Sequence, residues 1–293
     1  MSEPSLRIVY FSSQGATGTG AVAGLLRQLG HEVALVVMTP GTARRPTLAY
    51  QDVTANPPLP ASLLITSKMA QLPSLLAGLK PDLILVTGFP RLLPPETLAL
   101  PRLGCVNVHP APLPAYRGPD PIFWQFYNGE PELGLTIHRM DTSFDTGPIL
   151  AQGSTPIGPD ETPDDVFPRL FEIAPPLLTA ALEKVIAGDP GTPQDPARSS
   201  YAPIPSVDDR RVAWGRTARQ IHNQIRACFG SGALALVGGE ERLIHRARLA
   251  PEIATAGVNP GEIILTTEAG ALIQTGNGAL LIEEMAPAEV GEA

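Results

Sequence analysis

The sequence predicts an α/β domain built on a doubly wound parallel sheet, followed by a smaller OB-like β-barrel domain. The first observation is the strand–loop–helix–strand order of the opening: residues 6–11 read as a buried strand, a helix runs to about residue 29, and residues 30–38 form the next strand. Such an order gives parallel strands joined by right-handed crossovers. The second observation is five short apolar segments between Ala233 and Glu284, separated by glycine-rich turns, which is typical of a small barrel.

The domains are predicted to span residues 1–187 and 207–293, with a linker over residues 188–206. The linker is rich in Pro, Gly, Asp and Ser, the composition of an exposed connection. At 293 residues and 43% hydrophobic content, the chain is long enough for two cores.

The composition argues against several classes of protein, namely broad nucleic-acid binders, membrane-spanning proteins and disulfide-linked proteins. The formal net charge of −8 gives no support to a broad nucleic-acid footprint, although it leaves room for a local basic patch. No segment approaches 18 consecutive apolar residues, and the first residues carry no signal-peptide pattern. Two distant cysteines, Cys105 and Cys228, imply no disulfide framework. We therefore expect a cytoplasmic protein with no membrane segment.

The stretch that organises the chain is an Asn-Val-His-Pro sequence at the end of a predicted strand. Residues 103–109 form an apolar run that ends in polar residues, and alternate side chains of a strand share a face. Asn107 and His109 therefore point to one side, and the intervening valines point to the core. Pro110 holds His109 extended and ends the ladder. This pair lies where open α/β sheets bind ligands.

These residue types suit acyl transfer to an amine. An amide can donate a hydrogen bond to a developing oxyanion, and an imidazole can move a proton near neutral pH. A carboxylate such as Asp145 can orient the imidazole and accept a proton in turn. The residues alone leave a structural role for the Asn-x-His pair open.

The sequence motifs around these residues resemble those of the folate-dependent formyltransferases, a family that includes methionyl-tRNA, glycinamide ribonucleotide and sugar N-formyltransferases. The resemblance is carried by Asn107-Val108-His109, by the Leu-Pro-Ala-Tyr-Arg-Gly loop at 113–118 and by Asp145-Thr146-Gly147, and it runs from about residue 6 to 281. It implies transfer of a formyl group from 10-formyltetrahydrofolate to an amine, with no metal. Asn107 and protonated His109 would stabilise the oxyanion, and Asp145 would pair with His109 as the third catalytic residue.

The resemblance also implies the cofactor and substrate contacts. The folate would be surrounded by Phe89, Arg91, Leu92, Leu93, Met140 and Asp141. Backbone groups at 92 and 93 would read the polar edge of the pterin, and the backbone of the 140–145 loop would help to enclose it. The acceptor would meet Ser13, Gln14 and Gly15 in the first loop, and Arg117 and Gly118 in the 113–118 loop. A cis bond is expected at Leu113-Pro114.

The identity of the amine acceptor stays open between two classes, as does the oligomeric state. The domain pair and the Tyr201-Ala-Pro sequence resemble methionyl-tRNA formyltransferases, and Arg44-Arg45 could be the remnant of their tRNA-binding loop. Two features argue against tRNA as the acceptor. Residues 207–293 contain eight Arg, no Lys and eleven acidic residues, so this region is net negative. Ala111 and Pro112 also stand where Ser and Leu are common in the family. These features favour a small-molecule amine such as an amino sugar. Hydrolysis of the formyl group and a non-catalytic folate-binding module are weaker alternatives.

Overall fold

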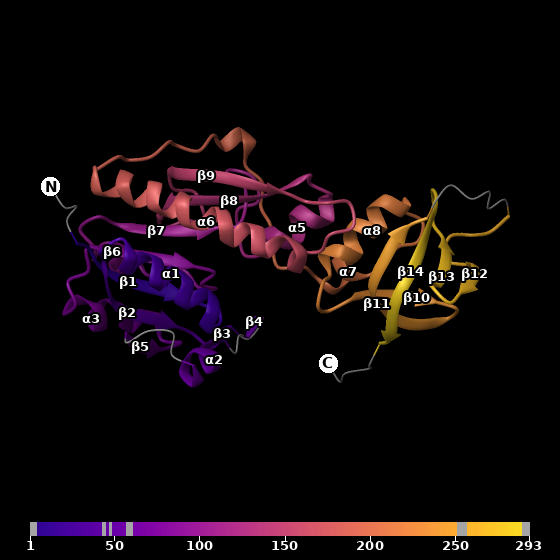
Figure 1. Cartoon of the computed structure of the whole chain (residues 1–293), viewed down its shortest axis with the longest axis horizontal. Coiled ribbons are helices and arrows are strands. Elements are labelled where there is room, and N and C mark those ends of the chain that lie inside the picture. Colours follow the sequence, from indigo (N-terminus) through magenta and orange to yellow (C-terminus); the bar gives the residue numbers. More distant parts are fainter. Residues whose placement is uncertain (1–4, 43–44, 47–48, 57–60, 251–256, 289–293) are drawn as a thin grey trace. The chain divides into compact units, whose positions relative to one another are not determined.

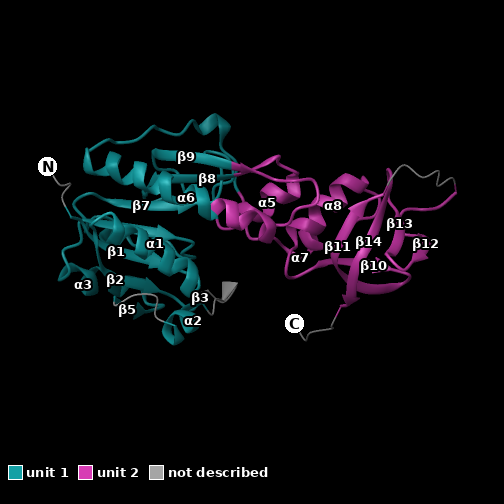
Figure 2. Cartoon of the chain, in the orientation of Figure 1, with its two compact units in different colours: residues 1–118, 134–154, 171–201 teal, residues 119–133, 155–170, 202–293 magenta. Residues whose placement is uncertain are grey.

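The computed structural model describes residues 5–42, 45–46, 49–56, 61–250 and 257–288 (Figure 1). Contacts between residues divide the chain into two compact units (Figure 2). The first unit comprises residues 1–118, 134–154 and 171–201, and the second comprises residues 119–133, 155–170 and 202–293. These units are interleaved in sequence, whereas the predicted domains are continuous, so the predicted boundaries stay a prediction.

The sheet of the first unit has seven strands in the order β5-β2-β1-β6-β7-β8-β9. In chain order they are β1 (Arg7–Ser12), β2 (Glu32–Met38), β5 (Ser62–Ile65), β6 (Leu83–Thr87), β7 (Cys105–His109), β8 (Glu132–Arg139) and β9 (Ile149–Pro156). The strands from β5 to β7 are parallel, which confirms the predicted α/β fold. One difference is that β8 runs antiparallel to β7, so the sheet is mixed.

Alternation along β1 places core residues on both faces of this sheet. Ile8 and Tyr10 pack with α1 (Ala16–Gln28) and with the C-terminal half of α6 (Pro163–Ile186). Val9 and Phe11 point the other way and pack with α3 (Leu72–Ala77). A strand buried on both faces reads as a continuous apolar run, which is how the opening segment appears in the sequence.

Residues 39–60 show no clear periodicity in the sequence, yet their described part contains three short elements. They are β3 (Gly41–Thr42), β4 (Arg45–Pro46) and α2 (Ala49–Ala55). Of the Arg44-Arg45 pair, Arg44 lies outside the described residues, and only the backbone of Arg45 is described. The remaining short helices of this unit are η1 (Met69–Gln71), α4 (Pro95–Leu98) and η2 (Pro196–Arg198).

Helix α6 continues through Pro175 and Pro176, where the sequence predicts a break or a bend. Two prolines remove two backbone donors from a helix. Leu178 and Leu182 on the following turns are buried against the sheet, and this packing supports the helix beyond the prolines. The predicted break is therefore wrong, because tertiary packing outweighs the local cost, and the alternative of a bend stays a prediction.

The second unit contains a five-stranded antiparallel sheet in the order β10-β11-β14-β13-β12. Its strands are β10 (Ala233–Val237), β11 (Glu240–Leu249), β12 (Ile263–Thr267), β13 (Gly270–Gln274) and β14 (Ala279–Pro287), and its helices are α5 (Pro121–Asn128), α7 (Val207–Arg210) and α8 (Ala218–Ala227). The five predicted strands are thus present. Strands β10 and β12 lie at the edges in the described residues, so closure into an OB-like barrel stays a prediction.

The core of this unit forms between α8, α5 and the sheet. Ile221 and Ile225 lie on one face of α8 and are buried with Phe126 and Leu280. Thr217 caps the helix by accepting a hydrogen bond from the Gln220 N–H. Across the described part of the chain, none of the helices combines the length and the apolar character needed to cross a membrane.

Replacing Gly134 with alanine tests how closely β8 packs under the 111–113 backbone. An added Cβ would lie 2.4 Å from the Pro112 backbone nitrogen, a distance that real contacts do not reach. We expect Gly134→Ala to lower the free energy of unfolding by about 1–3 kcal/mol, the usual cost of overpacking, in urea denaturation followed by circular dichroism.

The matched control is Gly24→Ala in α1, where no described atom outside the helix lies within 4 Å of the added Cβ. This change should raise the free energy of unfolding by about 0.5–1 kcal/mol, because alanine favours a helix interior. Equal stabilities of the wild type and the Gly134 variant would contradict the described packing.

Candidate active site

Strand β7 presents Asn107 and His109 from the face predicted by the sequence. Cys105 on the same face is buried in the cluster under α3, and Val106 and Val108 pack on the opposite face. Strand β7 ends at His109, at the carboxyl edge of the parallel strands. Both predicted polar side chains are therefore held by a rigid strand at the edge where α/β sheets bind ligands.

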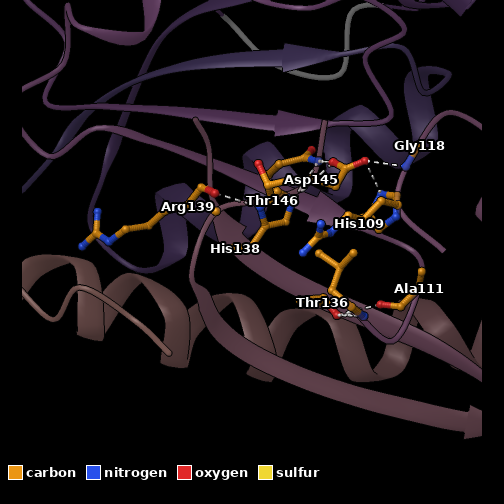
Figure 3. A network of polar contacts seen from close by, with 12 residues as sticks. His109, Ala111, Gly118, Thr136, His138, Arg139, Asp145 and Thr146 are labelled. Atoms are coloured by element: carbon orange, nitrogen blue, oxygen red, sulfur yellow. Dashed lines mark hydrogen bonds and ion pairs between the residues drawn. The ribbon is translucent and has the colours of Figure 1, made fainter. Parts of the chain in front are cut away.

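His109 is buried, and each of its ring nitrogens faces an oxygen. Its Nε2 lies 2.8 Å from the Tyr116 carbonyl oxygen and donates to it. Its Nδ1 lies 3.7 Å from Asp145 Oδ2 (Figure 3). Burial lowers the pKa of His109, although the charge of Asp145 and the Tyr116 carbonyl act in the opposite direction. At neutral pH the ring is therefore neutral, with its proton on Nε2 and Nδ1 as the basic nitrogen.

The Asp145 carboxylate collects several donors from different elements. Its Oδ2 accepts a hydrogen bond of 2.9 Å from the Gly118 N–H, and its Oδ1 accepts one of 3.2 Å from Asn107 Nδ2. His138 Nε2 lies 3.4 Å from the same Oδ1. Burial alone would raise the pKa of Asp145, but the His138 contact, the two imidazoles and the Gly118 N–H lower it to about 2. The carboxylate is therefore ionised throughout the physiological range.

The loop that carries Asp145 is held in a strained conformation. Asp145 has φ 54°, the left-handed region that residues other than glycine rarely adopt. Asp141 stabilises the loop, because its carboxylate accepts hydrogen bonds from the Ser143 N–H and the Thr146 hydroxyl. At Gly147 an added Cβ would lie 1.9 Å from the Arg139 carbonyl oxygen, so this position requires glycine.

His138 joins the site from the neighbouring strand. The β7–β8 register pairs it with Asn107, and its Nε2 lies 3.3 Å from Asn107 Nδ2. Its Nδ1 donates to the Arg139 carbonyl oxygen at 2.8 Å, which leaves Nε2 for the site. The alternation of β8 in the sequence places His138 on one face with Thr136. Its contact with Asp145 could not be read from that pattern, because it depends on the loop that follows the strand.

The 113–118 loop closes over His109. The expected cis bond at Leu113-Pro114 is present. Tyr116 has φ 61°, which turns its carbonyl oxygen toward His109, and its N–H donates to Ser200 Oγ at 2.8 Å. Thr136 supports the start of the loop, since its hydroxyl donates to the Ala111 carbonyl oxygen and accepts from the Leu113 N–H.

Arg117, predicted to contact the acceptor, has its guanidinium on Gln194. The Arg117 Nε and terminal amino groups donate to Gln194 Oε1 at 3.0 and 2.7 Å. Gln194 Nε2 in turn donates to the backbone carbonyl oxygens of Asp145 and Gly147. Neither Gln194 nor Ser200 could be identified from the sequence, because both lie in a segment with the composition of a linker.

Three of the four apolar residues predicted to meet folate belong to one cluster. Leu93 is buried, Phe89 meets Phe11 edge to face at 5.1 Å, and Met140 packs beside them. The Leu92 side chain is 45% exposed. The backbone N–H groups of Leu92 and Leu93 have no hydrogen-bond partner among the described residues.

The two polar residues of the predicted folate set have partners within the protein. The Arg91 guanidinium donates to the Gly41 carbonyl oxygen, with its Nε at 3.1 Å. The Asp141 carboxylate accepts hydrogen bonds from the Ser143 N–H and the Thr146 hydroxyl of its own loop. Phe89, Leu93 and Met140 of the predicted set therefore lie in one apolar cluster, and the charged side chains of Arg91 and Asp141 hold the neighbouring loops.

The first loop places Ser13, Gln14 and Gly15 after β1, where Ser13 Oγ and Gln14 Oε1 are buried and find no hydrogen-bond partner in the part of the chain that the structure describes. Gly15 caps α1, and the Ala16 N–H donates to Asp52 Oδ2 at 2.6 Å. A carboxylate thus already lies at this helix start, and an anionic group of an acceptor would meet a like charge there.

Solved structures that resemble this fold include two folate-bound proteins. HypX from Aquifex aeolicus in complex with tetrahydrofolic acid matches with a TM-score of 0.69 and 21% identity over 98% of this chain and 45% of that chain. An N-formyltransferase from Helicobacter canadensis, in complex with folinic acid and dTDP-3-aminofucose, matches with a TM-score of 0.69 and 19% identity over 95% of this chain and 99% of that chain. At these identities the likeness concerns the fold.

Relatives in sequence are named methionyl-tRNA formyltransferase. One from a Synechococcus strain is 39% identical over 214 residues, which are 71% of this chain and 66% of that protein, just under two thirds of its length. One from Pelotomaculum thermopropionicum is 34% identical over 267 residues, which are 89% of this chain and 85% of that protein.

Two family models match the chain in the order of its predicted domains. The model described as formyl transferase matches residues 6–182, and the model described as formyl transferase, C-terminal domain, matches residues 206–290. Together with the relative that matches over most of both chains, these matches show that the chain belongs to the formyl transferase family.

Proposed function

We propose that the protein transfers a formyl group from 10-formyltetrahydrofolate to an amine. The observation that carries this proposal is the pairing of a buried, neutral His109 with the ionised Asp145 carboxylate, beside the Asn107 amide. A basic nitrogen, a group that stabilises its protonated form and an amide donor are what acyl transfer to an amine needs.

The residues predicted to hold folate fit an aromatic ring with a polar edge. The cluster of Phe89, Leu93 and Met140, with exposed Leu92 beside it in sequence, supplies apolar surface. The unpaired N–H groups of Leu92 and Leu93 can donate to acceptor atoms at the edge of a pterin. The bound folate would supply a formyl group on a nitrogen that leaves as an amine.

In the proposed mechanism, His109 Nδ1 takes the proton that the attacking amine releases as it bonds to the formyl carbon. The imidazolium so formed is stabilised by the Asp145 carboxylate, and it then returns the proton to the leaving nitrogen of the folate. Asn107 donates to the formyl oxygen as negative charge develops there. Its amide nitrogen lies 3.2 Å from Asp145 and 3.3 Å from His138, at the long end of the usual hydrogen-bond range. One of these contacts can therefore be replaced by a hydrogen bond to the formyl oxygen.

This mechanism differs from the expected one in the charge of His109. The sequence resemblance implies a protonated His109 that stabilises the oxyanion. The burial of the ring favours its neutral form, which makes His109 a base before it can act as an acid.

Removing either member of the proposed pair should abolish most of the activity. We expect His109→Ala and Asp145→Ala to lower the kcat of formyl transfer by about 10²–10⁴-fold, the contribution of a positioned proton-transfer group. The measurement is tetrahydrofolate release in the presence of the acceptor, with circular dichroism spectra to show that the variants fold.

Cys105→Ala is the matched control, on the same face of β7 as Asn107. Burial raises the pKa of the Cys105 thiol to about 12, so it has no nucleophilic thiolate. Its kcat should stay within about threefold of the wild type, since only core volume changes. Near-wild-type turnover in both site variants would refute the mechanism.

The pH dependence of kcat separates the two charge states of His109. If the neutral ring is the working form, kcat at saturating acceptor is level above the lowered pKa and falls as pH drops through it. If the protonated ring were the working form, kcat would instead rise as pH falls. Measuring kcat at saturating substrate from neutral pH to well below the ordinary histidine value decides between them, because the two forms predict opposite slopes as pH falls.

For the acceptor, we propose methionyl-tRNA, in a cytoplasmic protein. The support is the relatives' shared name and the match to both family models across the chain. The two buried, free cysteines fit a reducing compartment. A small amine is the second candidate, favoured by the acidic excess over residues 207–293, which contain eight Arg and eleven Asp or Glu.

Methionyl-charged initiator tRNA should therefore give a large increase in tetrahydrofolate release from 10-formyltetrahydrofolate. The KM for the tRNA should rise steeply with salt, because phosphate contacts release counterions. Uncharged tRNA is the control and should give no increase. If the charged tRNA has no effect while folate still binds, the acceptor is a small amine, and amino sugar nucleotides are the first to test.

A further inference from the structure

Gln194 makes four hydrogen bonds that join three separate stretches of chain. Its side-chain nitrogen donates to the carbonyl oxygens of Asp145 and Gly147, both at 2.8 Å. Its side-chain oxygen accepts from the Arg117 Nε and terminal amino group at 3.0 and 2.7 Å. The amide thus uses both its donors and both its acceptor positions within the protein.

The two loops that Gln194 joins are those that build the site. The 141–147 loop carries the Asp145 carboxylate. In the 113–118 loop, the Tyr116 carbonyl accepts a hydrogen bond from His109, and the Gly118 N–H donates one to Asp145. Asp145 and Tyr116 have φ 54° and 61°, conformations that persist only when the surroundings hold them. Gln194 bonds to the carbonyl of Asp145 itself, so it acts directly on the strained residue.

The segment around Gln194 is itself fixed to the first unit. Thr192 and Ile149 exchange two backbone hydrogen bonds of 2.8 Å. At the other end, Ser200 Oγ accepts from the Tyr116 N–H, and the Ser200 carbonyl accepts from the Arg117 N–H. Residues 192–200 are therefore bound to strand β9 at one end and to the 113–118 loop at the other, and Gln194 lies between these two anchors.

We infer that Gln194 is a positioning residue, which locks the two loops together and so holds the Asp145 carboxylate against His109. The role requires a side chain that donates at one end and accepts at the other. Glutamate would keep the contact with Arg117 but lose both donors to the 145–147 backbone. Alanine would lose all four bonds.

The experiment compares Gln194→Ala and Gln194→Glu with Ser199→Ala. Ser199 lies in the same segment, and among the described residues its hydroxyl donates only to the Pro196 carbonyl oxygen of that segment. We expect both Gln194 variants to lose about 100-fold in kcat, with the KM for folate unchanged, because a small displacement of a catalytic group lowers the rate to that extent. Ser199→Ala should match the wild type.

A loss in both Gln194 variants assigns the effect to the donors toward Asp145 and Gly147. A loss in Gln194→Ala with wild-type activity in Gln194→Glu would overturn the inference, because the contact with Arg117 would then be what matters. Lower thermal stability in both variants with unchanged kcat would overturn it as well.

A second measurement does not depend on activity, and it is needed because the kinetic test rests on the proposed function. The carboxyl carbon of Asp145 is followed by NMR in aspartate-labelled protein without substrates. In the wild type the pKa of about 2 places its titration below the working range. In Gln194→Ala the carboxylate should move away from its partners, weaken those contacts and titrate at higher pH, toward the ordinary value of 3.8.

An unchanged Asp145 titration in Gln194→Ala would overturn the inference. If the wild type transfers no formyl group to any acceptor, the proposed function fails, and the NMR titration still decides whether Gln194 positions Asp145.

Discussion

The ionised carboxylate of Asp145 is the feature on which the rest of the site depends. A buried charge is costly unless it is hydrogen-bonded, and this one is contacted from β7, from β8 and from the 113–118 loop. Each contact comes from a different part of the first unit. Because two of them come from the neighbouring strands β7 and β8, the strand order of the sheet lowers the cost of burying the Asp145 charge. Its low pKa follows from these contacts, because burial acts against it.

The same constraint explains why strained backbone and a linker-like segment lie at the site. Delivering a carboxylate from a loop to a strand end requires a sharp turn, and Asp145 and Tyr116 both adopt left-handed conformations. Such conformations cost about 1–3 kcal/mol each, so neighbouring groups must hold them. The Asp141 carboxylate, the close approach at Gly147 and the Gln194 side chain provide that support.

The sequence was sufficient for the parts of this arrangement that follow from local periodicity. Alternation predicted the shared face of Asn107 and His109, and the apolar runs predicted the strands of both units. The sequence was insufficient where a contact between distant residues determines the structure. Gln194 lies in a segment whose composition indicates a linker, and the continuity of α6 through Pro175 depends on burial of later turns. The neutral state of His109 likewise depends on burial, which no single residue type reveals.

The charges of the pair also bear on how an amine would be activated. With His109 neutral and Asp145 ionised, the pair carries one negative charge before anything binds. An amine in water is largely a cation, and a negative site in a region of low dielectric attracts it. Only the neutral amine can attack, and His109 Nδ1 is the base able to accept a proton at that point. A pair that started as imidazolium and carboxylate would carry no net charge, and His109 would have no lone pair to accept a proton, so burial of His109 favours the proposed attack by an amine.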